Sequence, residues 1–280
     1  MRIGAHFWIW EPAVSVENAS LIEKISKMGF DAVELPILDT NFPIGYVKQH
    51  LTTTNLSVAV TAGCFPHTNP LSVDQGVRTN ALKYLGYVVG AASKLGAEVV
   101  AGPIYAAVGD LRFLTQQEKI ELIASAAEAL RPIVKKAKDL GVKLALEPLN
   151  RYDMNLINTA SEGLNLVNKI GEDDVGLLLD TFHMNIEERS LGEAIRSVGK
   201  RLYHLHTSES NRGAPGTGTV NWMEVADAVK SIGYNGICVI ESFTLKDQGF
   251  AAAMRMWSPK SASQDQLAEA GLIFLRRLFA

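Results

Sequence analysis

Four side chains able to bind a metal ion or to transfer protons stand at the ends of four apolar runs. The run "KLALE" ends on Glu147, "GLLLD" on Asp180, "LYHLH" on His206 and "ICVIE" on Glu241. Three carboxylates packed together repel one another unless protons or a cation neutralise them. Oxygen ligands with one imidazole suit Mn²⁺, Mg²⁺ or Co²⁺ better than the thiolate sites that zinc favours. The pattern therefore predicts one divalent metal ion per chain, bound by these four residues.

A second histidine, His204, lies two residues before His206. Alternate residues of a strand face the same side, so the pattern alone does not rank the two. The position of His206 at the end of the run favours it as the ligand, and we expect His204 deeper in the core.

The four residues belong to a longer alternation of short apolar runs and helical patterns. Eight runs, rich in Val, Ile and Leu, are typical of parallel strands buried on both faces: 3–8, 32–37, 56–63, 97–102, 143–148, 175–180, 202–206 and 237–242. Between them, helical patterns are expected from Ser15 to about Gly29 and from Thr115, with Glu118 as its capping-box partner, to Gly141. Segment 245–263 is expected to be an excursion between the last strand and the final helix.

Eight strand-then-helix units in 280 residues predict an α/β protein, a single (β/α)8 TIM barrel domain covering residues 1–280. A doubly wound open sheet is disfavoured, because no glycine-rich turn follows the first run and no change in composition marks a second domain. In such barrels the functional residues stand at the carboxyl ends of the strands. The spacings of 33, 26 and 35 residues each fit about one unit, which brings the four side chains to one rim.

Composition excludes several classes of partner. The net charge is −3 with no basic run, so nucleic acid is not an expected partner. No apolar stretch has the length of a membrane span and the N-terminus lacks a signal-peptide pattern, which predicts a cytoplasmic protein without membrane association. Cys64 and Cys238 lie in apolar runs and are expected to be buried thiols.

Several segments resemble the ketose 3-epimerases, the family of D-tagatose 3-epimerase and D-psicose 3-epimerase. The segments are "LALEPLNRYD", "LLLDTFHMNIEE", "HLHTSESNRGAPGTG" and "GYNGICVIESF". The resemblance spans nearly the whole chain and implies an isomerase that inverts C3 of a free ketohexose or ketopentose through an enediolate. It also implies Mn²⁺, with Co²⁺ or Mg²⁺ as alternatives, and a homodimer or homotetramer.

The resemblance assigns roles to residues. Glu147, Asp180, His206 and Glu241 would bind the metal, and Glu147 and Glu241 would also act as the catalytic acid/base pair. His183 and Arg212 would hold the substrate oxygens. The chemistry fits, because two carboxylates on opposite faces of a planar intermediate can exchange protons with either epimer.

The pocket departs from the family pattern at two positions. Asp153 in "NRYD" stands where the family usually has glutamate, and Val108 stands where some members have tryptophan. Asp153, His6 at the end of the first run and Tyr105 after the fourth run are expected to contact the substrate. Glu34, at the end of the second run, is expected in the pocket wall.

Four functions remain open to this pattern. Besides the epimerase, an aldose–ketose isomerase or an inosose-type dehydratase would use the same metal set. A phosphodiesterase resembling endonuclease IV is disfavoured by only six histidines and the negative net charge. A non-catalytic sugar-binding protein would have no use for two carboxylates positioned for proton transfer.

Overall fold

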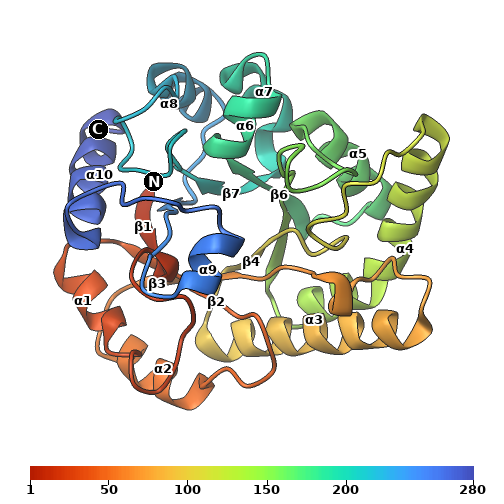
Figure 1. Cartoon of the computed structure of the whole chain (residues 1–280), viewed down its shortest axis with the longest axis horizontal. Coiled ribbons are helices and arrows are strands. Elements are labelled where there is room, and N and C mark those ends of the chain that lie inside the picture. The colour runs from red at the N-terminus through yellow and green to blue at the C-terminus, as the bar shows by residue number, and fades with distance from the viewer.

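The computed structural model describes residues 1–280, and its eight parallel strands close into a barrel in chain order (Figure 1). The strands are β1 Arg2–His6, β2 Ala32–Pro36, β3 Ser57–Thr61, β4 Val99–Gly102, β5 Lys143–Leu146, β6 Val175–Asp180, β7 Leu202–His206 and β8 Ile237–Ile240. Every predicted run overlaps one of them, so the predicted (β/α)8 barrel is confirmed.

The helices surround the barrel, as Figure 1 shows. They are α1 Leu21–Lys27, α2 Ile44–Thr52, α3 Gln75–Leu95, α4 Gln116–Asp139, α5 Ala160–Ile170, α6 Thr181–Glu187, α7 Leu191–Val198, α8 Trp222–Ser231, α9 Gln248–Ala253 and α10 Gln264–Leu278, with 3-10 turns Phe7–Ile9, Pro66–Thr68 and Gly199–Arg201. No helix combines the length and the apolar character needed to cross a membrane.

Local sequence explains where two helices begin. The Thr115 hydroxyl accepts the backbone N–H of Glu118, whose carboxylate returns to the Thr115 N–H, so the predicted capping box opens α4. The helix expected from Ser15 begins only at Leu21. The Asn18 side chain bonds the Ser15 N–H and the Ala13 carbonyl, and these local bonds hold the backbone in turns before the helix starts.

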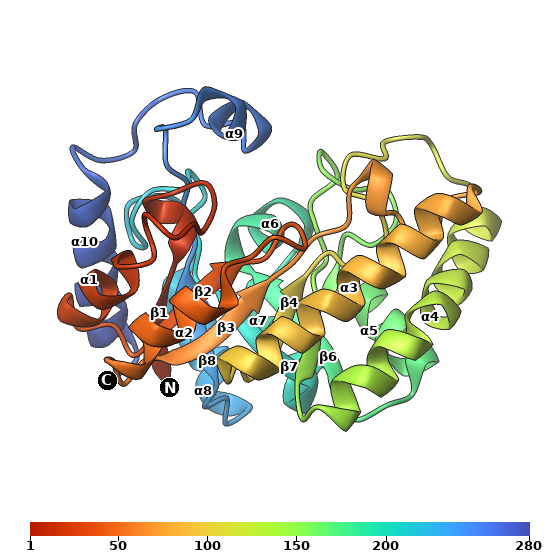
Figure 2. The ribbon, with the colours of Figure 1, turned by 90° about the horizontal axis from the view of Figure 1, so that it is seen from below.

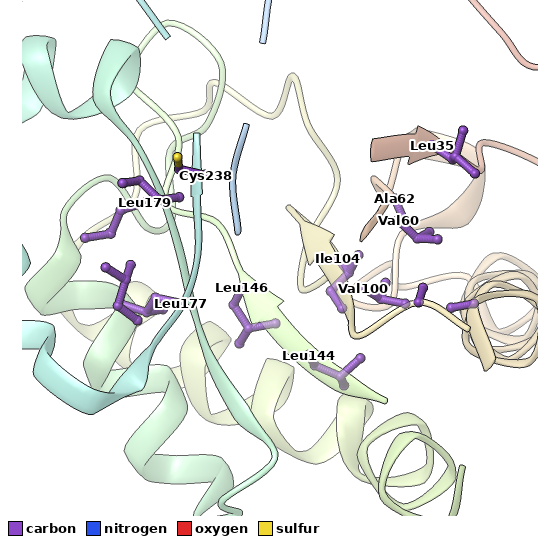
Figure 3. Packing of buried hydrophobic residues seen from close by; sticks show 14 of the residues in the cluster. Leu35, Val60, Ala62, Val100, Ile104, Leu144, Leu146, Leu177, Leu179 and Cys238 are labelled. Carbon is purple, nitrogen blue, oxygen red and sulfur yellow. The ribbon is translucent and has the colours of Figure 1, made fainter. Parts of the chain in front are cut away.

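Residue parity separates the two faces of the barrel wall. The leucines that pack outward against the helices are Leu144 and Leu146 of β5 and Leu177 and Leu179 of β6, and Figure 3 shows them together with residues of neighbouring strands. The residues that alternate with them, such as Ala145 of β5 and Leu178 of β6, belong to a small interior cluster that also contains Ala32, Ala59, Val99, Ala101, Ile237 and Val239. Because side chains alternate along a strand, a residue two positions beyond an interior residue also points inward.

The segment after β8 forms a separate layer over the barrel. Figure 2 shows α9 on the side of the molecule away from the N-terminus, where β1 begins. Ala251 of α9 and Met256 are buried against Trp8 and Phe243 in a small apolar cluster of their own. The predicted excursion at 245–263 is therefore an ordered cover over the carboxyl ends of the strands.

Candidate active site

The interior parity of the strands positions the predicted metal ligands. Glu147 lies two residues beyond Ala145, Asp180 two beyond Leu178, and Glu241 two beyond Val239, all of which are interior residues. Asp180 and His206 are register partners at the ends of β6 and β7. All four ligand candidates are buried, so the barrel brings them to one rim as the strand-end spacing predicted.

We call the three carboxylates of Glu147, Asp180 and Glu241 the acidic cluster. Arg212 lies between two of them, Asp180 and Glu241. Its Nη1 atom is 2.9 Å from Asp180 Oδ2 and 2.8 Å from Glu241 Oε2. The guanidinium also stacks on Phe182, with Cζ 3.9 Å from the ring centroid. Arg212 is thus a fixed buried cation beside the acidic cluster.

Two imidazoles complete this group. His206 Nδ1 is 3.8 Å from Asp180 Oδ2 and 3.6 Å from Glu241 Oε1. His183 Nε2 is 3.8 Å from Glu147 Oε1 and 3.9 Å from Asp180 Oδ2. Both rings therefore face carboxylate oxygens at distances longer than hydrogen bonds.

The environments of the carboxylates shift their pKa values in opposite directions. Burial raises the pKa of Glu147 well above its ordinary value, and the charges of Glu241 and Asp180 raise it further. Burial also acts to raise the pKa of Asp180 and of Glu241. The positive charges of Arg212 and His206 outweigh this effect, so the pKa of each carboxyl group is lowered. The pKa values of the cluster therefore move apart, with that of Glu147 raised and those of Asp180 and Glu241 lowered.

The donor set fits a divalent cation. Glu147, Asp180 and His183 have ligand atoms that lie together, and so have Asp180, His206 and Glu241, so that Asp180 joins the two groups. His206 Nδ1 is buried without a hydrogen-bond partner, as expected of a nitrogen whose partner is a metal ion. Carboxylate oxygens with imidazole nitrogen match the preferences of Mn²⁺, Co²⁺ and Mg²⁺.

The loop that carries Arg212 is organised by Glu209, which the sequence did not single out. The buried Glu209 carboxylate accepts the backbone N–H groups of Ser210, Gly216 and Val220 and the indole N–H of Trp222. Arg212 itself has a positive φ of 59°, and the Ser242 hydroxyl donates to its carbonyl at 2.6 Å. These bonds hold Arg212 in a backbone conformation that non-glycine residues rarely adopt.

Asn150 orients His183 and was also missed. The backbone N–H of Asn150 donates to His183 Nδ1 at 3.1 Å, which leaves Nε2 facing the acidic cluster. The Asn150 side-chain amide donates to Asp153 Oδ2 at 2.9 Å. Nothing in a single sequence marks this asparagine, because His183 lies on another βα unit.

A cavity of about 320 Å³ opens from the acidic cluster toward the α9 segment. Its inner end is lined by Glu147, His183, Arg212 and Glu241, and its sides by Trp8, Leu38, Phe65, Val108, Phe182, Phe243 and Met256. At its outer end Arg255 forms an ion pair with Asp153 and donates to the Tyr152 carbonyl at 3.2 Å. A few polar groups at one end of an apolar-walled cavity are typical of a small-molecule site.

Two expected contact residues lie behind the cavity wall. His6 is fully buried, with Nδ1 accepting the Trp8 N–H and Nε2 bonded to Thr61, and Trp8 lines the cavity in its place. Tyr105 is also fully buried and donates its hydroxyl to the Glu147 carbonyl at 2.9 Å. Both nitrogens of His6 and the Tyr105 hydroxyl already have protein partners, so the structure gives these residues a supporting place and not a place on the cavity surface.

Comparison with known proteins agrees with this geometry. Residues 22–278 match the family described as "Xylose isomerase-like TIM barrel". The chain is 33% identical to the D-psicose 3-epimerase of Ruminiclostridium cellulolyticum over 95% of this chain and 92% of the relative. It is 32% identical to the L-ribulose 3-epimerase of Mesorhizobium japonicum, over 98% and 93% respectively.

Solved structures give the same result. A D-psicose 3-epimerase from Clostridium cellulolyticum H10 with D-tagatose superposes with a TM-score of 0.90 at 32% identity, covering 100% of this chain and 99% of that one. A D-allulose 3-epimerase from Methylomonas sp. in complex with D-allulose has a TM-score of 0.92 at 29% identity, over 99% and 96%.

The chain belongs to the xylose isomerase-like TIM barrel family. Within that family it is a ketose 3-epimerase family member, and it is therefore an enzyme, a carbohydrate epimerase. The resemblance read from "LDTFHMNIEE" and "ESNRG" is confirmed.

Proposed function

We propose that this enzyme inverts C3 of a free ketohexose or ketopentose by proton transfer, with a divalent metal ion as cofactor. The observation that carries the proposal is the pair of buried carboxylates, Glu147 and Glu241, at the inner end of the cavity, whose pKa values are shifted in opposite directions. Two carboxyl groups whose pKa values are shifted in opposite directions are the usual signature of an acid and a base in one site.

Proton transfer assigns the two carboxylates different roles. Glu241, whose pKa is lowered, serves as the base that removes the C3 proton in one direction. Glu147, whose pKa is raised, serves as the acid that returns a proton to the opposite face, and in the reverse direction the roles exchange. The two side chains enter from β5 and β8, on separate parts of the barrel wall, as attack on two faces of a flat enediolate requires.

The metal ligands in this proposal are Glu147, Asp180, His206 and Glu241. When bound, a divalent ion supplies positive charge next to the carbonyl and so makes the neighbouring C–H more acidic. Mn²⁺ is the preferred ion of the proposal, with Co²⁺ and Mg²⁺ as alternatives.

His183 and Arg212 hold the oxygens at the reacting end of the sugar. His183 presents Nε2 to the cavity because Asn150 occupies Nδ1. Arg212 presents a fixed cation from a loop that Glu209 and Ser242 hold in place. Donors that are fixed before the reaction stabilise developing oxyanion charge without reorganisation.

Asp153 is proposed to contact the far end of the sugar. Its carboxylate lines the outer part of the cavity and pairs with Arg255. A carboxylate accepts and a guanidinium donates, so together they match hydroxyl groups, which do both. The pair favours neutral polyhydroxy substrates, because Asp153 already neutralises the charge of Arg255.

Two parts of the proposal rest on the family resemblance: a homo-oligomer and a cytoplasmic location. Trp257 and Phe113 are large apolar side chains that are 77% and 90% exposed, which is consistent with surfaces that another subunit covers. Light scattering coupled to size-exclusion chromatography measures the oligomeric state, and a monomer at micromolar concentration would contradict this part.

Proton exchange in D₂O tests the reaction. The enzyme is loaded with Mg²⁺, or with Mn²⁺ that is removed before spectra are recorded, and is given a panel of free ketohexoses and ketopentoses. We expect deuterium at C3 together with the C3 epimer, and loss of both in Glu241→Gln. Glu98→Gln, a carboxylate that pairs with Arg2 at the other end of the barrel, is the matched control. Deuterium at C1 with aldose formation would indicate an isomerase, and no exchange would refute the choice of substrate.

A further inference from the structure

A fourth carboxylate, Glu34 of β2, lies behind the proposed metal ligands and outside the cavity lining. It is fully buried, and so are the residues that it contacts. Glu34 Oε2 is 3.0 Å from His206 Nε2 and 2.8 Å from His204 Nε2. The Thr61 hydroxyl donates to the other oxygen, Oε1. A single carboxylate thus joins strands β2, β3 and β7 inside the barrel.

The direction of each hydrogen bond in this network follows from its outermost member. The backbone N–H of Trp8 donates to His6 Nδ1 at 3.1 Å, so His6 carries its proton on Nε2. That N–H donates to Thr61 Oγ1 at 2.9 Å, and the Thr61 hydroxyl proton is left for Glu34. Since Glu34 Oε1 is the acceptor from Thr61, its carboxylate is free to accept at Oε2 from both histidines.

The same network fixes which nitrogen of His206 faces the acidic cluster. With Nε2–H donated to Glu34, Nδ1 is the nitrogen directed toward Asp180 and Glu241, at 3.8 and 3.6 Å from their nearest oxygens. His206 Nδ1 has no hydrogen-bond partner of its own. The ring is therefore held by one nitrogen so that the other points at the proposed metal position.

We propose that Glu34 is a positioning residue that orients His206 Nδ1 for metal binding. The inference rests on the metal ion of the proposed function. A carboxylate behind a metal-binding imidazole fixes the ring and strengthens its bond to the metal. A purely structural role does not account for a charged group at this position, because burying an ionised carboxylate costs free energy that an uncharged residue would not cost.

Glu34→Gln is the informative variant. Glutamine has the same shape but only one acceptor oxygen, so it cannot accept from Thr61, His204 and His206 together. We expect Mn²⁺, added alone to the metal-free enzyme and measured by competition with a chelating dye, to bind 10–100-fold more weakly. Glu98→Gln, which removes a carboxylate far from the acidic cluster, should bind Mn²⁺ as the wild type does.

A spectroscopic measurement separates positioning from general damage to the fold. In the Co²⁺-loaded wild type, the Nε2 proton of His206 should give a hyperfine-shifted NMR signal that exchanges slowly with water, because the proton is buried and bound to Glu34. In Glu34→Gln this signal should shift and exchange faster. Should that variant fail to fold, the wild-type signal decides: a fast-exchanging or absent Nε2 proton overturns the proposal.

The outcomes distinguish this inference from the proposed function. If folded Glu34→Gln binds Mn²⁺ within about threefold of the wild-type affinity, the proposed role of Glu34 is overturned. This holds whether or not the variant epimerises a sugar. Weakened Mn²⁺ binding in the variant, with no epimerisation by the wild type, supports Glu34 and refutes the proposed reaction. A wild type that binds neither Mn²⁺ nor Co²⁺ refutes both.

Discussion

Arg212 is the closest cation to Asp180 and Glu241, and removing its charge should therefore destabilise the metal-free enzyme. Arg212→Met keeps a stem that can still pack against Phe182, but leaves Asp180 and Glu241 buried without their closest cation. Removing one partner of a buried ion pair costs about 3–5 kcal/mol. At the roughly 2 °C per kcal/mol that applies to long chains, the thermal midpoint should fall by about 6–10 °C.

Added Mn²⁺ should restore part of this loss. In the variant the ion meets carboxylates that no guanidinium neutralises, so it should raise the midpoint more than it does in the wild type. Differential scanning calorimetry with and without Mn²⁺ measures both increments. Arg131→Met, at an exposed arginine that pairs with Glu128, serves as the control and should change stability by no more than about 0.5 kcal/mol.

The pH dependence has a definite sign. In the wild type the pKa values of Asp180 and Glu241 are lowered, so their contribution to stability is present above the ordinary carboxyl pKa and lost as pH falls through the lowered values. Without Arg212 the same groups take up protons more readily. The deficit of Arg212→Met should be largest near pH 8 and shrink toward pH 5. A deficit that is independent of both Mn²⁺ and pH would refute the view that Arg212 acts by neutralising the acidic cluster.

Two further predictions concern the loop of Arg212 and the outer cavity. Gly218→Ala would bring a Cβ atom within 2.5 Å of Glu209 Oε1, so stability in urea should fall by about 1–3 kcal/mol, whereas Gly45→Ala, which meets nothing within 4 Å, should change it little. Arg255→Ala breaks a partly exposed ion pair with Asp153 and should cost at most about 1 kcal/mol of stability. It should raise KM for ketohexoses more than for ketopentoses while Mn²⁺ affinity stays unchanged, and equal effects on both sugars would contradict the outer-end role of Asp153.

The barrel and the ends of its strands could be predicted because their signals are local. Each apolar run carries its own length and composition, and a polar residue that ends it is visible without knowledge of the fold. The parity of "LALE" and "LLLD" also predicts that Glu147 and Asp180 share the face of Ala145 and Leu178, as they do. Ser15 shows the limit of local signals, because Asn18, three residues before α1, competes for the same backbone groups.

The rest of the site depends on contacts between distant parts of the chain. Glu34 and His204 are 170 residues apart in sequence, and only closure of the barrel brings β2 and β7 within reach of one carboxylate. His6 was expected in the cavity because it stands near the end of the first apolar run, where the family resemblance implies aromatic side chains against the sugar. The chain turns sharply after it, and Trp8 covers the ring with its centroid 4.3 Å away. A position at the end of a strand predicts that a residue lies at the rim of the barrel. It does not predict which side chain at the rim reaches the surface of the cavity.

The charges of the site suggest how the metal-free and metal-loaded forms interconvert. Without metal, burial raises the pKa of Glu147, while Glu34 and Glu241 outweigh burial and raise that of His206. A metal ion binds the deprotonated nitrogen of an imidazole, so metal and proton compete for His206. Mn²⁺ binding should thus release protons, and the affinity should weaken as the pH falls. Calorimetric titrations in buffers of different ionisation enthalpy count these protons directly, and a count near zero would refute the competition.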